Sequence, residues 1–180
     1  MKRFALITVA AVSLAACAEE PMGPVAPAPY AGSPPPSGSS SVFRPEDFAW
    51  SAQAGSGTIV GSLGFHTASS RYTCQGGDVI LTPETPWTRR RMFILYGSPV
   101  AAAVPLDIVR ARTPSAPSGD YARFAKKTTC DSDNHFSFAG LPDGGWFVIT
   151  LAKPVDMQGD AIAVMRRVET RGSLRTVTLN

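Results

Sequence analysis

The residues with the most distinctive chemistry in this 180-residue chain are its three cysteines, Cys17, Cys74 and Cys130. A pair of thiols can form a disulfide, ligate a metal or supply a nucleophile. A zinc site needs further ligands at short spacing, which neither Cys74 nor Cys130 has. A catalytic thiol needs a base, and only His66 and His135 are available for that role.

A second candidate site is the oxygen-rich segment Asp131-Ser132-Asp133-Asn134, which has the spacing of the first ligands of a calcium loop. A complete loop of this kind requires an oxygen ligand at position five, a glycine at six and an acidic residue at twelve. Those positions hold His135, Phe136 and Pro142. The segment therefore predicts a turn held by Asx hydrogen bonds, with no metal.

Nothing else in the sequence indicates a reaction. Ser56, Ser62 and Ser69 all lack the G-x-S-x-G setting of a hydrolase nucleophile. The two histidines are far apart in the chain, so a shared metal site is not indicated. We therefore predict a protein that is not an enzyme and has no cofactor.

The first residues predict an export signal. Lys2 and Arg3 precede an apolar run, 4–16, that is too short to span a bilayer. The run ends in Leu14-Ala15-Ala16-Cys17, which resembles the lipobox of bacterial lipoproteins. The resemblance implies cleavage before Cys17 and acylation of that cysteine, including palmitate, which anchors the chain in the lipid bilayer. The alternative is an ordinary signal peptide cut after an A-x-A-like site.

The predicted compartment bears on the other two cysteines. Ala18, rather than aspartate, follows Cys17, which favours sorting to the outer membrane. With Cys17 acylated, Cys74 and Cys130 are left as an even pair in an oxidising periplasm. We therefore predict a Cys74–Cys130 disulfide.

The charge of the chain excludes one class of partner. The formal net charge is +3, and removing Lys2 and Arg3 leaves fifteen basic and fourteen acidic residues. No basic run is interleaved with aromatic residues, so nucleic-acid binding has no support. The densest basic run, 89–91, and the pairs 126–127 and 166–167 predict solvated surface, with orientation on an anionic lipid surface as the alternative.

The chain divides into a signal (1–17), a tether (18–41) and one domain (42–180). The tether holds seven prolines and three glycines, too little apolar material for a core. In the domain, 44–50 predicts a short helix because proline and acidic residues open it. Short apolar runs punctuated by glycine and proline predict strands. They are 58–63, 78–82, 91–96, 106–109 within a long loop at 97–119, 121–129, 135–141, 146–151, 161–170 and 174–179.

Two pairs of these strands predict hairpins. Pro142-Asp143-Gly144-Gly145 joins the strand 135–141 to the next one, and Arg171-Gly172-Ser173 joins the last two strands. Seven or eight such strands, the edge strand at 106–109 not counted, predict an all-β fold, an antiparallel Greek-key sandwich.

Three stretches resemble the carboxypeptidase regulatory-like domain. Gly57 to Gly61 matches its opening strand, Gly77 to Pro83 its second strand, and Cys130 to Val148 its turn–strand–turn–strand core. The resemblance implies a transthyretin-like (prealbumin-like) sandwich that supports or tethers other functions. The sequence departs from the family at Asn134, where glycine is usual, and in the longer segment 97–119.

These observations predict a non-catalytic outer-membrane lipoprotein whose sandwich faces the periplasm or the cell surface. We expect a structural or protein-interaction role with an envelope protein as partner. The alternative is a glycan- or peptide-binding module that uses the 97–119 loop and nearby aromatic residues such as Trp87 and Tyr96.

Overall fold

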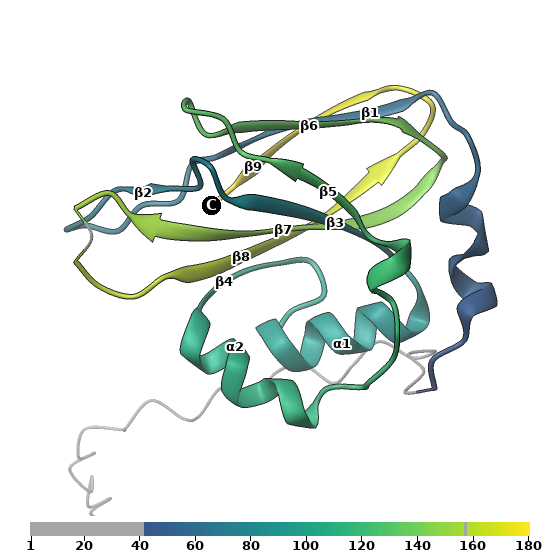
Figure 1. The fold of residues 1–180 in the computed structure, drawn as a ribbon, viewed down its shortest axis with the longest axis horizontal. Coiled ribbons are helices and arrows are strands. Elements are labelled where there is room, and N and C mark those ends of the chain that lie inside the picture. The colour runs from purple at the N-terminus through teal and green to yellow at the C-terminus, as the bar shows by residue number, and fades with distance from the viewer. Residues whose placement is uncertain (1–41, 157) are drawn as a thin grey trace, which may run out of the picture. The chain divides into compact units, whose positions relative to one another are not determined.

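The computed structural model describes residues 42–156 and 158–180; the predicted signal, Cys17 and the tether lie outside them. Two sheets face each other, and two helices cover the outer face of the larger sheet (Figure 1). The strands are β1 (Gly57–Leu63), β2 (Tyr72–Thr73), β3 (Asp78–Pro83), β4 (Ala101–Pro105), β5 (Lys126–Thr129), β6 (His135–Leu141), β7 (Gly144–Pro154), β8 (Ile162–Thr170) and β9 (Leu174–Leu179). The helices are α1 (Pro86–Tyr96) and α2 (Leu106–Arg112), with 3-10 segments η1 (Pro45–Ala52), η2 (Thr113–Ser115) and η3 (Ala122–Phe124).

The smaller sheet has the strand order β6-β1-β9 and the larger has β4-β8-β7-β3-β5, with β2 on the end of β7. β9 runs parallel to β1, and the other pairs are antiparallel. The prediction of a mainly β, two-sheet sandwich is thus confirmed, whereas the prediction that all strands pair antiparallel is wrong at β1 and β9. No helix of the described residues is long and apolar enough to cross a membrane.

The larger sheet has a core on each of its faces, because alternate residues of a strand point to opposite sides. Trp146 and Val148 of β7 pack between the two sheets, together with Ile59 of β1. Phe147, next to them in the sequence, packs on the other side against Met92 and its neighbours. β7 is therefore apolar without alternation along its centre, as expected for a strand covered on both faces.

Both predicted hairpins are wrong. β6 pairs with β1, and β7 pairs with β3 and β8, so the turn at Pro142-Asp143 carries the chain from one sheet to the other. β8 and β9 likewise lie in different sheets. A turn-forming sequence between two alternating strands fits either connection, because it specifies a reversal and not a partner. The long hairpin of this fold is β7–β8.

The run 91–96, predicted to be a strand, is the second half of α1. Thr85 caps this helix, since its side chain accepts from the amide of Thr88 while the Thr88 hydroxyl accepts from the amide of Thr85. Pro86 is its first residue, and Gly97 ends it with φ of 76°. The apolar residues of 91–96 fit a strand locally, but the start and stop signals favour a helix.

The predicted loop 97–119 holds β4, α2 and η2, so the expected edge strand at 106–109 is a helix and the strand lies just before it. The predicted strand 121–129 is a strand only from Lys126, after the 3-10 segment η3. The short helix expected at 44–50 is present as the 3-10 segment η1.

Candidate functional site

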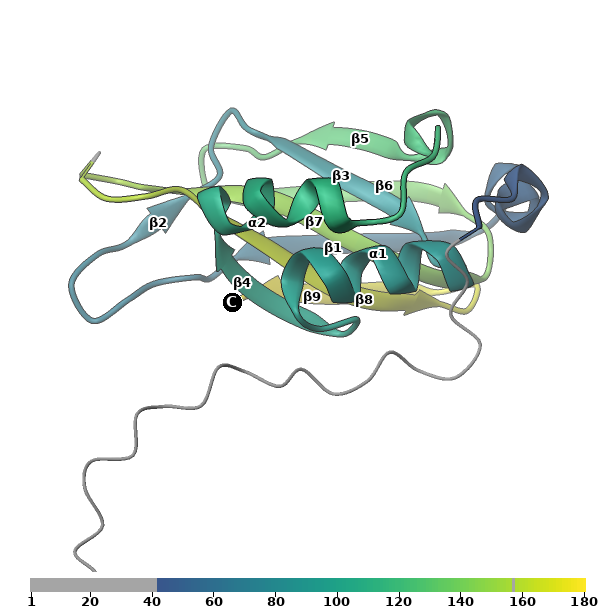
Figure 2. The same ribbon diagram turned by 90° about the horizontal axis from the view of Figure 1, so that it is seen from below.

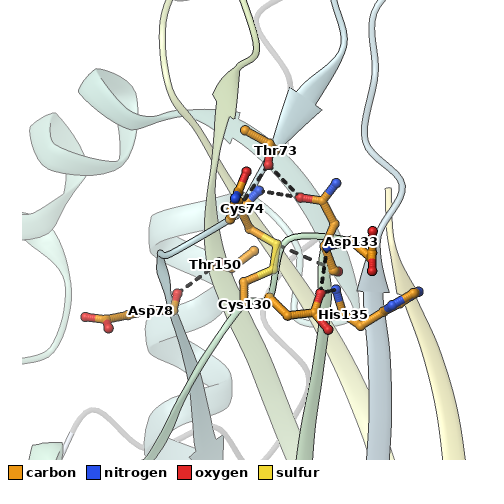
Figure 3. The surroundings of a disulfide bond; sticks show 10 residues. Thr73, Cys74, Asp78, Cys130, Asp133, His135 and Thr150 are labelled. Atoms are coloured by element: carbon orange, nitrogen blue, oxygen red, sulfur yellow. Dashed lines mark hydrogen bonds between the residues drawn. A yellow bond between two sulfur atoms is a disulfide. The ribbon is translucent and has the colours of Figure 1, made fainter.

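Cys74 and Cys130, which were expected to pair, form a disulfide between the residue after β2 and the residue after β5 (Figure 3). Both are buried, with exposed fractions of 2% and 1%. Backbone hydrogen bonds on either side join the same two segments: Gly76 donates to the Cys130 carbonyl, and Cys130 donates to the Gly77 carbonyl, each at 2.9 Å. The disulfide is therefore part of a tightly bonded corner.

Asn134 completes this corner. Its side-chain oxygen accepts from Thr73 Oγ1 at 2.7 Å and from the Cys74 amide at 2.9 Å. It adopts a left-handed conformation with φ of 65°, which asparagine tolerates better than most residues. A glycine at this position would adopt the same backbone conformation but would make neither hydrogen bond.

The acidic turn is an Asx turn, as predicted. Asp131 Oδ1 accepts from the amides of Asp133 and His135, at 2.9 and 2.7 Å. Among the described residues, no group of three or more histidine, cysteine, aspartate or glutamate side chains is arranged to hold a metal ion. The carboxylate that suggested calcium binding is used by its own backbone.

The two histidines are both exposed and lie on different elements, His66 after β1 and His135 at the start of β6. His66 Nδ1 lies 3.1 Å from the Gly64 carbonyl oxygen. Within the described chain, neither ring is hydrogen-bonded to a serine, threonine or cysteine side chain. The arrangement of a base beside a nucleophile is therefore not formed at these residues.

The arginine run 89–91 does not form one patch. Arg89 binds Glu84. Arg91 lies over the rings of Trp87 and Tyr121, 5.8 and 5.2 Å from their centroids, and donates to the Pro117 carbonyl at 2.7 Å. These contacts give two of the three arginines positions in the packing of α1.

Glu84 is the most buried partner in the charged network of the larger sheet. Its side chain is 8% exposed and receives both Arg167 Nε and Nη2, at 2.7–2.8 Å, besides Arg89. The hydrogen bond to Glu84 raises the pKa of Arg167 above its usual value. A Cβ on Gly145 would overlap the Glu84 carboxylate, so only glycine allows this approach. The network joins the start of α1 to β8.

The aromatic residues proposed for a binding loop are unavailable for that role. Trp87 is fully buried and Tyr96 is 8% exposed. Burial raises the pKa of Tyr96 to about 12. Both side chains belong to the packing of α1, so a glycan or peptide site built on them and on a 97–119 loop is ruled out.

A different aromatic residue lines a polar hollow. Trp50, Gln53, Ser56 and Asp143 border a depression of about 320 Å³ at the end of the sandwich where the chain crosses between sheets. We call it the crossover hollow. Trp50 is half-buried, and the other three side chains are exposed. An indole ring beside a carboxylate, an amide and a hydroxyl can bind a ligand that has both apolar C–H faces and hydroxyl groups.

The fold fixes both walls of the crossover hollow. Trp50 packs edge-on against Trp146 with ring centroids 4.9 Å apart, and it lies so close over Gly144 that a Cβ there would sit 2.4 Å from the indole. Asp143 Oδ1 accepts from the amide of Gly172, which ties the β6–β7 crossover to the β8–β9 crossover. Trp50 is therefore held by the core, and Asp143 is held by its hydrogen bond to the other crossover.

The same two crossovers are joined from the inside by Thr170, which is fully buried. Its hydroxyl accepts from Trp146 Nε1 at 3.1 Å and lies 2.7 Å from the Pro142 carbonyl oxygen, to which it donates. The sequence contains a partial signal for this site, because Trp50 is the aromatic residue that ends the short helix expected at 44–50. Gln53 and Ser56 had no signal, because their role depends on which strands meet at that end.

Comparison with known proteins supports the fold. No family model matches the chain, and no curated protein matches it. One similar solved structure is the crystal structure of a "putative carbohydrate binding protein" from Pseudomonas aeruginosa. It has a TM-score of 0.54 and 20% sequence identity, and the match covers 76% of this chain and 96% of that one. At this identity the comparison shows a shared two-sheet, mainly β fold.

Proposed function

We propose that this chain is a non-catalytic envelope lipoprotein whose sandwich binds a glycan at the crossover hollow. The observation that carries the binding site is the half-buried indole of Trp50 beside Gln53 and Asp143. Sugar rings offer C–H faces that an aromatic ring can contact, and hydroxyl groups that amide and carboxylate side chains can bind. The name of the similar solved structure points to the same ligand class.

The hollow has groups free to bind. Asp143 uses one carboxylate oxygen for Gly172, and within the described residues its second oxygen has no partner. The side-chain amide of Gln53 likewise has no hydrogen bond to any described residue, although its backbone closes η1. Donors and acceptors that are exposed and unpaired lose little when they exchange water for a ligand.

The proposal includes the anchor and the domain family. Acylation of Cys17 would place the chain in the outer membrane, with the domain in the periplasm or at the surface, and the carboxypeptidase regulatory-like resemblance would make the sandwich transthyretin-like with Greek-key connections. The Leu-Ala-Ala-Cys motif supports the first and the three matching stretches support the second. Intact mass analysis of the mature protein tests the anchor: an unmodified Cys17, or cleavage elsewhere, contradicts it.

The glycan site predicts a specific loss of binding. Gln53→Ala and Asp143→Asn should each weaken binding about fivefold to tenfold, the effect of removing one hydrogen bond. The measurement is titration of intrinsic tryptophan fluorescence, with chitotetraose, cellotetraose, maltotetraose and muramidase-released peptidoglycan glycan as probes. Asp143→Asn keeps an oxygen that can accept from Gly172, so the fold should persist.

The matched control is Gln75→Ala, which removes an exposed glutamine beside the disulfide, at the other end of the sandwich. It should leave saccharide binding unchanged. Equal effects of the Gln53 and Gln75 substitutions, or no saccharide response in the unsubstituted protein, would show that the crossover hollow is not a glycan site.

A second candidate function, protein interaction, is favoured by a different observation. β9 is an edge strand of the smaller sheet, and an edge strand offers unpaired peptide groups to another chain. This candidate does not involve the crossover hollow.

A further inference from the structure

The two sheets of the sandwich differ in width. Between β5 and β4 the larger sheet has five strands side by side, whereas the smaller sheet has three. β9 lies across from β8 of the larger sheet, and β4 is the edge strand beyond β8 (Figure 2). The position next to β9 and opposite β4 is therefore open.

The exposure of β4 agrees with this view. Ala102 and Val104 pack toward the helices, whereas Ala101, Ala103 and Pro105 are all exposed. Because Ala101 lies directly opposite Arg166 and Ala103 opposite Val164, the exposed residues share the face that points between the sheets. Ala101, Ala103 and Pro105 thus form an exposed surface of small side chains on the face of β4 that points toward the smaller sheet. We call this surface the β4 shelf.

The free edge of β9 carries unpaired backbone groups. The carbonyls of Ser173 and Leu179 accept from β1, so the odd-numbered residues point their peptide groups toward β1 and the even-numbered ones point away. The carbonyl of Thr178 follows this pattern, because it accepts from Arg166 of β8 at 3.2 Å and not from β1. Among the described residues β9 pairs only with β1, which leaves the peptide groups of Thr176 facing outward.

The groove beside this edge is positively charged. It has a volume of about 550 Å³ and lies between β8 and β9, lined by three arginines and one carboxylate, Arg166, Arg167, Arg175 and Glu169, together with Thr176, Thr178 and Asn180. Arg166 donates only to neutral acceptors, Thr178 O and Asn180 Oδ1.

The second arginine of the groove is also available. The hydrogen bond from Arg171 is the main cause that lowers the pKa of the Glu169 carboxyl, and the nearby charge of Arg175 adds to it. Arg175 itself forms no ion pair within the described part of the chain. Two guanidinium groups without a carboxylate partner therefore border the open position.

We propose that the free edge of β9, beside the groove between β8 and β9, binds an extended acidic segment of another protein as a fourth strand of the smaller sheet. The partner's backbone would pair with the outward peptide groups of Thr176 and with the amide of Thr178. Its small or apolar side chains would cover the β4 shelf, and its carboxylates would pair with Arg166 and Arg175. A second copy of this chain is disfavoured as the occupant, because pairing β9 with β9 would bring the arginines of both copies into one groove. This inference specifies the partner for the protein-interaction candidate and is independent of glycan binding.

The test uses synthetic peptides and nuclear magnetic resonance of the ¹⁵N-labelled domain. The acidic probe Thr-Glu-Thr-Val-Thr-Glu-Thr should shift the amide signals of Thr176 and Thr178. A probe with lysine in place of both glutamates should bind more weakly, by about tenfold or more, since it loses two ion pairs and gains repulsion. The acidic peptide with N-methyl groups on alternate residues should not bind, because it cannot pair with a strand edge.

Thr176→Pro removes the outward amide of β9 without touching a β1 hydrogen bond, and Thr176→Ala is its matched control. We expect binding to be lost in the first and kept in the second. The N-methyl peptide tests the same point on the unsubstituted protein, so a misfolded variant does not decide the result. Equal binding of acidic and lysine peptides, shifts elsewhere on the domain, no binding, or dimerisation through β9 without peptide would each overturn the proposal. Saccharide titration of the same sample separates this failure from a failure of the glycan site.

Discussion

Replacing Cys74 and Cys130 together by alanine is expected to lower the free energy of unfolding by about 4 kcal/mol, the value of the chain-entropy model for a loop of this size. The disulfide closes a loop with a sequence separation of 56 residues. Without it, the unfolded chain gains conformational freedom, while the folded corner keeps the hydrogen bonds that Asn134 accepts and the one that Gly76 donates. Urea unfolding followed by tryptophan fluorescence measures the change.

Alanine, rather than serine, is the suitable replacement because both sulfur atoms are buried and a hydroxyl would need a partner there. The unsubstituted protein in strong reductant should show a comparable loss, which separates the missing cross-link from the missing atoms. A loss below about 1 kcal/mol would mean that the unfolded chain is already restricted in this loop, or that the disulfide strains the fold.

Glu84→Ala is expected to destabilise the fold by about 3 kcal/mol, at the low end of the range for breaking a buried ion pair. The substitution leaves Arg89 of α1 and Arg167 of β8 without their common carboxylate. We expect the low end because the two arginine side chains are 31% and 39% exposed, so water compensates part of the loss. Thermal and urea unfolding measure the effect.

The matched control is Glu169→Ala, which removes a surface carboxylate bonded to Arg171. Solvent-exposed ion pairs contribute little, so this variant should unfold like the unsubstituted protein. Glu84→Gln should fall between the two, because an amide can still accept from Arg167 but carries no charge. If both alanine variants had the same stability, the network around Glu84 would not be what holds α1 against β8.

The sequence predicted most strand positions but not which strands pair. The strands at 58–63, 78–82, 135–141, 161–170 and 174–179 agree with the structure to within a residue or two. Alternation of apolar residues reports that a strand is covered on one face, which is a local property. The partner across the ladder is set by the whole topology, so the crossovers after β6 and β8 were mistaken for hairpins.

The segment 91–96 shows why the helices were missed. Its residues are apolar because α1 lies on the outer face of the larger sheet, whose strand β7 contributes Phe147 to the same core. A continuous apolar run fits a buried strand or a buried helix equally well. The deciding signals lie outside the run, at Thr85, Pro86 and Gly97, where the helix is capped.

The candidate site was less predictable than the fold. The disulfide followed from the number of cysteines and the expected compartment. The crossover hollow did not, because Gln53 and Asp143 are distant in the sequence and meet only where both crossovers reach the same end of the sandwich. Trp87 was misassigned for the opposite reason: an aromatic residue near a presumed loop proved to be fully buried.

The parallel pairing of β1 with β9 has a consequence for the order of folding. β1 is the first strand of the described domain and β9 the last, so the smaller sheet cannot be completed until nearly the whole domain has emerged. Ladders between strands this far apart form late, because a long chain must be closed before any contact is gained. A domain of this design stays incomplete during synthesis. If the chain is exported as its first residues suggest, that delay would keep the domain unfolded until it has crossed the inner membrane.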